Sequence, residues 1–206
     1  MLQRHRFLRT REVRLVLRDL HKRKKRSSGI WTNLIIFRLA TGCGLRCREI
    51  CGLRIKDLVL KGAAPTLRVR KEYGKGKKAR KVPLDWDRGT LEDIREWVKF
   101  RVEVQGAQPS DRVVVVQRGG KLTPLRENKV ASRWKTAIKC LGPERVSQLS
   151  IHTGRHTFSS HATARGWTSG DVRDALGHAS ISTTNRYVHG QVDTPEMPDL
   201  YPMEDE

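Results

Sequence analysis

The chain has 206 residues, a length that fits one large domain, or one domain with extensions, better than two full-sized domains. Its 42 lysine and arginine residues outnumber 22 aspartate and glutamate residues, and the formal charge of +20 indicates a polyanionic partner. No segment has the apolar length of a signal-peptide core or a membrane span, so we expect a soluble cytoplasmic protein that contacts no membrane.

The first part of the chain predicts helices joined by short loops. Apolar residues at helical spacing indicate a helix from Phe7 to Leu20, which leads into the basic run 21–26. Cations suit the dipole at a helix C-terminus, so this run is either a solvated helix end or a contact or localisation signal. A second helix is expected from Ile30 to about Ala40 with one inward face, and a third helix from Leu45 or Arg46.

Between Leu58 and Leu84 the pattern changes to the period of two that is typical of strands. Apolar residues alternate with arginines before the turn sequence Gly74-Lys75-Gly76-Lys77, and the alternation resumes at Val82. The segment therefore predicts a β-hairpin. Between positions 61 and 81 there are nine lysine and arginine residues and one acidic residue, Glu72. This excess of positive charge favours contact with phosphate groups over an ordinary exposed edge strand.

The second half of the chain is mainly helical in its pattern. The expected helices share apolar residues three or four positions apart, and they cover 90–104, 123–141, 154–164, 168–176 and 180–188. The pair Thr123-Pro124 is interpreted as a helix start, and Trp134 as a core residue of that helix. Thr168 and Asp171 form a capping box, and a buried strand is expected over 113–116.

Four cysteines do not indicate a disulfide framework in a cytosolic chain, and none of them forms a C-x-x-C pair. Cys43, Cys47 and Cys51 are spaced so that a helix would place them on one face. We interpret them as small half-buried packing residues, because no histidine or fourth cysteine lies at a zinc-ligand spacing. The sequence therefore predicts no metal site.

Histidines, an arginine and a tyrosine in the last third of the chain form a set suited to phosphate chemistry. His152 and Arg155 lie three residues apart at an expected helix start, and His178 precedes Tyr187 by nine residues. A guanidinium group matches the two non-bridging oxygens of a phosphodiester and stays ionised. A tyrosine is a candidate nucleophile, but with an ordinary pKa of about 10 it needs a base or positive neighbours.

Five sequence boxes, in order, carry a resemblance to a known family. They are Gly42-Cys43-Gly44-Leu45-Arg46-Cys47-Arg48-Glu49, the hairpin residues 74–84, His152-Thr153-Gly154-Arg155-His156-Thr157-Phe158, Leu176-Gly177-His178 and Thr183-Thr184-Asn185-Arg186-Tyr187. Over Phe7 to His189 the chain resembles the catalytic domain of the tyrosine recombinases, or phage-type integrases. The resemblance implies an α+β fold, mainly α, with a small antiparallel three-stranded sheet.

The resemblance also implies the chemical roles of the site residues. Tyr187 would attack the scissile phosphorus, form a 3′-phosphotyrosyl bond and release a 5′-hydroxyl group. Arg46 and Arg155 would hold the non-bridging oxygens, and Lys75 at the hairpin tip would protonate the leaving oxygen. Neither a metal nor another cofactor is required, because the phosphotyrosine conserves the bond energy.

Further residues receive supporting roles from the same resemblance. His152 would act as general acid or base, and His178 would donate a hydrogen bond to the phosphate. Glu49, on the same helical face as Arg46, would support the site without contacting the phosphate. The residues expected to contact the DNA backbone are Lys77, Lys78, Arg80 and Lys81. Gly154 stands where the family usually has an apolar residue, and we expect it to add local freedom at the helix start.

The implied function is that of a site-specific DNA recombinase or integrase of a mobile element. It would act in the cytoplasm on the nucleoid, on double-stranded DNA, as a tetramer that is a monomer when free in solution. Two alternatives share many of these residues. One is a non-catalytic DNA-binding relative that regulates a partner recombinase, and the other is a strand-nicking topoisomerase.

Residues 1–190 are expected to form the catalytic domain, and residues 191–206 an acidic tail with prolines. The tail would dock on a neighbouring subunit or cover the basic groove of its own chain. Family members usually carry an N-terminal helical core-binding domain. With six residues before Phe7, we expect that domain to be absent and DNA binding to be weak and salt-sensitive.

Overall fold

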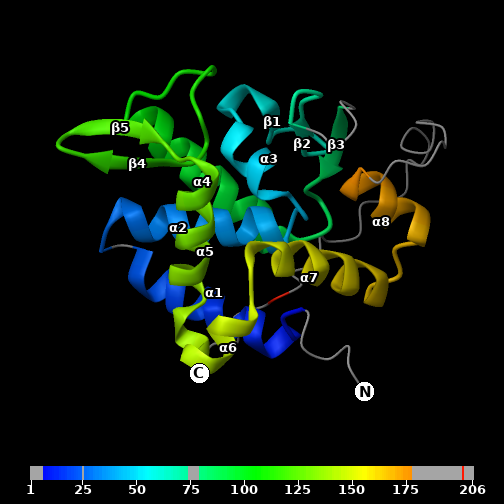
Figure 1. Cartoon of the computed structure of the whole chain (residues 1–206). Coiled ribbons are helices and arrows are strands. Elements are labelled where there is room, and N and C mark those ends of the chain that lie inside the picture. The colour runs from blue at the N-terminus through cyan, green and yellow to red at the C-terminus, as the bar shows by residue number, and fades with distance from the viewer. Residues whose placement is uncertain (1–6, 25, 74–78, 178–200, 202–206) are drawn as a thin grey trace.

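The structure is a computed structural model that describes residues 7–24, 26–73, 79–177 and 201. Its helices are α1 (Thr10–Lys24), α2 (Ser28–Thr41), α3 (Cys47–Gly52), α4 (Arg88–Glu103), α5 (Glu127–Ala137), α6 (Pro143–Gln148), α7 (Ile151–Ala164) and α8 (Ser169–Leu176). Its strands are β1 (Leu58–Val59), β2 (Thr66–Val69), β3 (Arg80–Pro83), β4 (Val115–Arg118) and β5 (Lys121–Pro124). The predicted fold class is confirmed (Figure 1).

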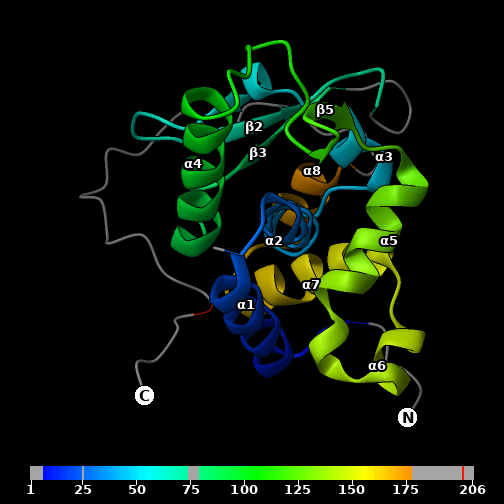
Figure 2. The ribbon, with the colours of Figure 1, turned by 90° about the vertical axis from the view of Figure 1, so that its left-hand side faces the viewer.

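Helix α2 forms the centre of the molecule. All of its residues from Thr32 to Thr41 are buried, and α1, α4, α5 and α7 pack around it (Figure 2). The prediction of one inward face was therefore too narrow, because the run Leu34-Ile35-Ile36-Phe37 is apolar on every side and requires cover all round. Trp134 of α5 is fully buried and stacks on Phe37 with ring centroids 5.5 Å apart, which confirms its predicted core position.

The predicted hairpin is part of a three-stranded antiparallel sheet in the order β1-β2-β3. Leu67 pairs with Val82 and Arg68 with Lys81, so one face of the ribbon is buried and the other carries exposed cations. Residues 74–78, which include the expected turn, lie outside the described residues. The sheet presents β3 to helix α8, which brings the hairpin beside the last part of the described chain.

A second hairpin replaces the helix start predicted at Thr123-Pro124. Gly119 and Gly120 both have positive φ, 52° and 77°, as a tight two-residue turn requires. This turn pairs Val116 with Thr123 in the two-stranded β4-β5 sheet, so the pairing overrides the local capping signal. Helix α5 begins only at Glu127, and the strand predicted over 113–116 is shifted to Val115–Arg118.

Other boundaries differ less from the expectations. Helix α7 begins at Ile151, three residues before the predicted start, and the short α6 was not predicted. The capping box of Thr168 and Asp171 at α8 is confirmed. The expected helix 180–188 lies outside the described residues. Within the ranges that the structure describes, no helix combines the length and apolar character that crossing a bilayer requires.

A buried ionic network ties α1, α2 and α4 together. Arg38 donates to Asp93 at 2.6 Å, His21 lies 2.9 Å from the same carboxylate, and the side chains of Arg38 and Asp93 are each 4% exposed. Burial raises the pKa of Asp93, but the hydrogen bond from His21 and the charge of Arg38 outweigh it and leave the pKa below its ordinary value. The network therefore stabilises the ionised carboxylate.

The lowered pKa of Asp93 predicts stability that is lost in acid. As the pH falls, the unfolded chain binds the proton first, at about pH 3.9. The stability that Asp93 contributes is thus fully present above that pH and is lost as the pH falls through the lower folded value. Urea unfolding between about pH 3 and 6 should show this loss, and Asp93→Asn should flatten it. An unchanged pH slope in the variant would contradict the prediction.

Gly154 is a close-packing residue of α7, which corrects the expectation that it adds local freedom. A Cβ atom built on Gly154 would lie 2.6 Å from the Cβ of Ala40 and 3.0 Å from the ring of Trp134. The backbone of α7 can thus approach α2 and α5 closely only because position 154 has no side chain. This contact fixes the depth of the helix that carries Arg155.

Replacing Gly154 with alanine should therefore destabilise the fold by about 1–3 kcal/mol, since the overpacked methyl group displaces α7 from α2. Urea unfolding measures the loss. Gly170→Ala in α8 is the matched control, because a Cβ there meets only Thr168 Oγ1 at 3.4 Å and the helix propensity improves. Equal stability of the two variants would show that the close approach is not a constraint.

Candidate active site

The loop between α2 and α3 carries the first box and is held against α7 and α8. Gly44 has a φ of 62°, and a Cβ on it would lie 2.6 Å from Leu176 and 2.7 Å from Phe158. Only glycine fits both the left-handed backbone and this close approach. The loop thereby delivers Arg46 to the N-terminus of α3, beside the end of α8.

Arg46 and Glu49 form a local pair at the start of α3. The carboxylate of Glu49 accepts hydrogen bonds from the backbone N–H of Arg46 at 2.8 Å and from its Nη1 at 3.0 Å. The side chain of Glu49 is fully buried, whereas that of Arg46 is 23% exposed. Glu49 thus orients Arg46 from the protein side and leaves part of the guanidinium group open to solvent.

Arg80 of β3 binds the other side of the same carboxylate. Its Nη1 and Nη2 donate to the two oxygens of Glu49 at 2.8 and 2.9 Å, and its Nε donates to the carbonyl oxygen of Ala175 at 2.7 Å. The side chain is only 9% exposed. Arg80 and Lys81 are the two described residues that were expected to contact the DNA backbone. Lys81 is exposed, whereas Arg80 has protein partners.

Arg155 enters the site from α7. It is 8% exposed, and its guanidinium group donates to the carbonyl oxygens of Gly44, at 2.6 Å, and Leu176. Figure 1 shows α3, β3 and α8 together above α7. Three segments that are far apart in the sequence thus bring together Arg46 and Arg80, which bind one buried carboxylate, and Arg155, which shares the end of α8 with Arg80.

The charges in this cluster do not balance. Burial, together with the positive charges of Arg46 and Arg80, lowers the pKa of Arg155 to about 9, and Glu49 opposes the shift only in part. Burial raises the pKa of Glu49, but the hydrogen bonds and charges of Arg80 and Arg46 leave it below its ordinary value. Three guanidinium groups around one carboxylate create a local excess of positive charge that an anion would relieve.

The structure does not describe all of the predicted site. His152 is exposed near the start of α7, one residue after the buried Ile151. Lys75, Lys77, Lys78, His178 and Tyr187 lie outside the described residues, and their roles remain predictions. The described chain ends at Gly177, which caps α8 with a φ of 62°, and a Cβ on Gly177 would lie 2.8 Å from Arg80 Cδ. The residue before His178 therefore lies against the arginine cluster.

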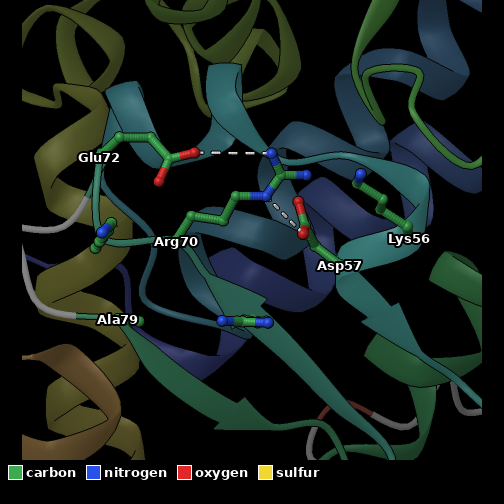
Figure 3. Close-up of a pocket in the computed structure, with 7 residues that line it drawn as sticks. Lys56, Asp57, Arg70, Glu72 and Ala79 are labelled. Atoms are coloured by element: carbon green, nitrogen blue, oxygen red, sulfur yellow. Dashed lines mark hydrogen bonds and ion pairs between the residues drawn. The ribbon is translucent and has the colours of Figure 1, made fainter.

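A basic cavity of about 500 Å³ lies beside the sheet. Its lining residues are Lys56, Asp57, Arg68, Arg70, Lys71, Glu72 and Ala79. Figure 3 shows Arg70 between two carboxylates, with Asp57 at 2.8 Å and Glu72 at 3.7 Å. Arg70 is thus paired within the protein, whereas Lys56, Arg68 and Lys71 are exposed at the cavity and extend the positive surface of the hairpin.

The cysteines serve packing. Cys43 is fully buried in the loop after α2, so it does not share a helix face with Cys47 and Cys51, and that expectation was wrong. Cys47 and Cys51 lie one turn apart on α3 and are half buried as expected. Among the described residues, no three histidine, cysteine or acidic side chains lie together in a way that could hold a metal ion.

Comparison with known proteins identifies the family. The profile of the phage integrase family matches residues 6–193. The chain belongs to the phage integrase family. This result confirms the resemblance carried by the five boxes.

Individual relatives of this chain are tyrosine recombinases. XerC of Myxococcus xanthus is 31% identical over 171 residues, which cover 81% of this chain and 52% of the relative. XerC of Pseudomonas aeruginosa (strain LESB58) is 35% identical over 149 residues, which cover 71% of this chain and 43% of the relative. The chain therefore spans about half the length of the curated relatives it matches.

Solved structures show the same fold. The crystal structure of the XerA recombinase has a TM-score of 0.66 at 19% identity, over 84% of this chain and 55% of that chain. The XerH site-specific recombinase bound to its palindromic difH substrate has a TM-score of 0.63 at 23% identity, over 85% and 46% of the two chains. The tyrosine recombinase fold is thus shown for the described part of the chain.

Arg80 was expected to contact the DNA backbone, and its contact with Glu49 was missed, although the sequence contained a signal for it. On a strand, residues two apart share a face, so Arg80 lies on the same face as the buried Val82, and Lys81 lies on the other. A count of positive charge along the hairpin treats the two residues alike. The alternation separates an inward cation from an outward one.

Proposed function

We propose that this protein is a site-specific recombinase that breaks and rejoins double-stranded DNA through a 3′-phosphotyrosyl intermediate. One observation carries the proposal. Arg155, which donates to the carbonyl of Gly44, lies beside the loop that carries Arg46, 109 positions away in the sequence, and the positive charge there exceeds that of the one buried carboxylate. A phosphodiester is the anion that both guanidinium groups suit, because its negative charge grows as the phosphorus is attacked.

In the proposed reaction, Tyr187 Oη attacks the phosphorus and His152 takes up the phenolic proton. The Oη–P bond forms as the bond from phosphorus to the 5′-oxygen breaks, and Lys75 gives that oxygen a proton. Arg46, Arg155 and His178 stabilise the charge on the non-bridging oxygens. Attack by a 5′-hydroxyl group of another strand reverses the steps and restores the phosphodiester.

The proposed assembly is a tetramer on two DNA duplexes, acting on the nucleoid. Residues 188–200 would dock on a neighbouring protomer, where their acids meet a basic surface. Tyr201, the one tail residue that the structure describes, packs on its own chain, with its hydroxyl group 2.6 Å from His161 Nδ1. Deleting residues 189–206 should reduce the size of the complex on DNA in sedimentation experiments. An unchanged size would remove the tail from the assembly.

The test of the chemistry uses a library of nicked suicide duplexes with a randomised centre. Wild type should yield a covalent protein–DNA adduct that survives a denaturing gel. The chain has three tyrosines, so Tyr73→Phe and Tyr201→Phe are matched controls that should keep the adduct, whereas Tyr187→Phe should lose it. Binding without any adduct in wild type would contradict the proposal and favour a DNA-binding protein that is not an enzyme.

A further inference from the structure

Arg80 joins Glu49 to the end of α8 through three hydrogen bonds. Its three donor atoms bridge β3, α3 and α8, and it follows the hairpin segment that carries Lys75. We propose that Arg80 is a positioning residue for strand cleavage, which acts through Glu49 on Arg46 and ties the C-terminal end of α8 to that pair. This inference rests on the proposed function of the site.

The first part of the inference concerns Glu49. Arg80 approaches both carboxylate oxygens, so Glu49 meets Arg46 with one side-chain hydrogen bond, at Nη1, rather than with a two-pronged pair. Without Arg80, the buried carboxylate would attract the nearby guanidinium groups more strongly, and Arg46 would turn inward. Arg80 therefore keeps the exposed part of Arg46 available for a phosphate.

The second part concerns the C-terminal end of α8. The last carbonyl groups of a helix have no partners within the helix, and here two of them are bound by arginines. Arg80 Nε binds the carbonyl of Ala175, and Arg155 binds that of Leu176. Gly177 then turns the chain with a left-handed backbone, directly against the side chain of Arg80. Arg80 thus fixes the C-terminal end of α8 up to Gly177.

A direct phosphate contact by Arg80 is the competing role, and the geometry argues against it. The side chain is 9% exposed, and Nε, Nη1 and Nη2 all donate to protein acceptors. A phosphate contact would contribute about one unit to the salt dependence of DNA binding, whereas a positioning residue would leave that slope unchanged. The two roles are therefore separable by measurement.

The experiment compares Arg80→Gln with Arg145→Gln. Arg145 forms a pair of the same kind far from the site: it donates to the two oxygens of Glu12 at 2.7 and 3.2 Å and to the carbonyl of Phe7 at 3.0 Å. Single-turnover cleavage of the nicked suicide duplex is measured at saturating protein, together with DNA affinity at several salt concentrations. Arg80→Lys is included as the conservative variant, which keeps the charge and loses the fork.

Arg80→Gln should slow cleavage at saturation by about 10–100-fold while the salt slope of binding stays unchanged. Arg80→Lys should recover part of the rate, and Arg145→Gln should cleave at the wild-type rate even where it lowers stability. Wild-type cleavage by Arg80→Gln would overturn the inference. A salt slope reduced by about one unit would also overturn it, because it would identify a phosphate contact.

Amide hydrogen exchange provides a readout that does not depend on activity. Peptides that cover 169–177 should exchange faster in both Arg80 variants than in wild type or Arg145→Gln, because the end of α8 loses its tie. If wild type formed no adduct, the proposed function would fail, and the exchange data would still decide whether Arg80 fixes this helix end. Unchanged exchange at 169–177 in both Arg80 variants would overturn the inference independently.

Discussion

Replacing Arg155 with lysine should slow strand cleavage at saturating protein by at least about 100-fold. The arginine is 8% exposed and its fork is oriented by the carbonyls of Gly44 and Leu176. Lysine keeps a positive charge but cannot span both carbonyls and present a planar pair of donors to a phosphate. The loss should therefore appear in the rate of adduct formation, with DNA affinity changing by less than about 10-fold.

Arg133→Lys is the matched control for this prediction. Arg133 of α5 is half buried, and it donates to the carbonyl of Gly29 and to the side chain of Asn33. Burial lowers its pKa as burial lowers that of Arg155, yet it lies outside the arginine cluster. The control should cleave at the wild-type rate. A wild-type cleavage rate of Arg155→Lys at saturating protein, with weaker binding as the only defect, would show that this arginine only binds DNA.

The Glu49→Gln variant should lose about 3–5 kcal/mol of folding free energy, because it leaves neighbouring guanidinium groups without their buried counter-charge. The amide matches the shape of the carboxylate, so the loss is electrostatic rather than a packing defect. Urea unfolding measures it. The double variant Glu49→Gln/Arg80→Gln should be more stable than the sum of the single effects predicts, since the second change removes one of the unpaired cations.

The effect of sulfate on stability is a second test of the arginine cluster. An anion that binds only the folded chain stabilises it by mass action, and the effect grows with the unbalanced positive charge. Sulfate should therefore raise the stability of Glu49→Gln more than that of wild type at equal ionic strength. Glu12→Gln, which breaks the remote pair with Arg145, is the control and should respond as wild type does. Equal responses of all three proteins would contradict an anion site among Arg46, Arg80 and Arg155.

Local signals with a single physical cause predicted the fold well. Three correct predictions each depend on residues close together in the sequence. They are the capping box of Thr168 and Asp171, the alternation around Leu67 and Val82, and the helical apolar stripe that includes Trp134. The pair Thr123-Pro124 misled because a capping signal says nothing about strand pairing across the Gly119-Gly120 turn. Such pairing is a tertiary effect that a short window of sequence does not contain.

The site was predictable in its residue types but not in its internal contacts. The spacing of Arg46 and Glu49 places them on one helical turn, and the pair is present. The carbonyls of Gly44 and Leu176 that orient Arg155 could not be foreseen, because a backbone carbonyl leaves no mark in the sequence. The close packing of Gly154 could not be predicted either, because it depends on which helices pack against α7.

The central position of α2 has a consequence for synthesis on the ribosome. Helix α2 ends at Thr41, but α7, which covers one of its sides, begins only at Ile151. In a growing chain, one apolar side of α2 therefore stays exposed until more than half of the polypeptide has emerged. Chaperones are most needed to prevent aggregation during that period. The same late helix carries Arg155, so a chain that ends before α7 lacks both the cover on this side of α2 and the second arginine of the proposed site.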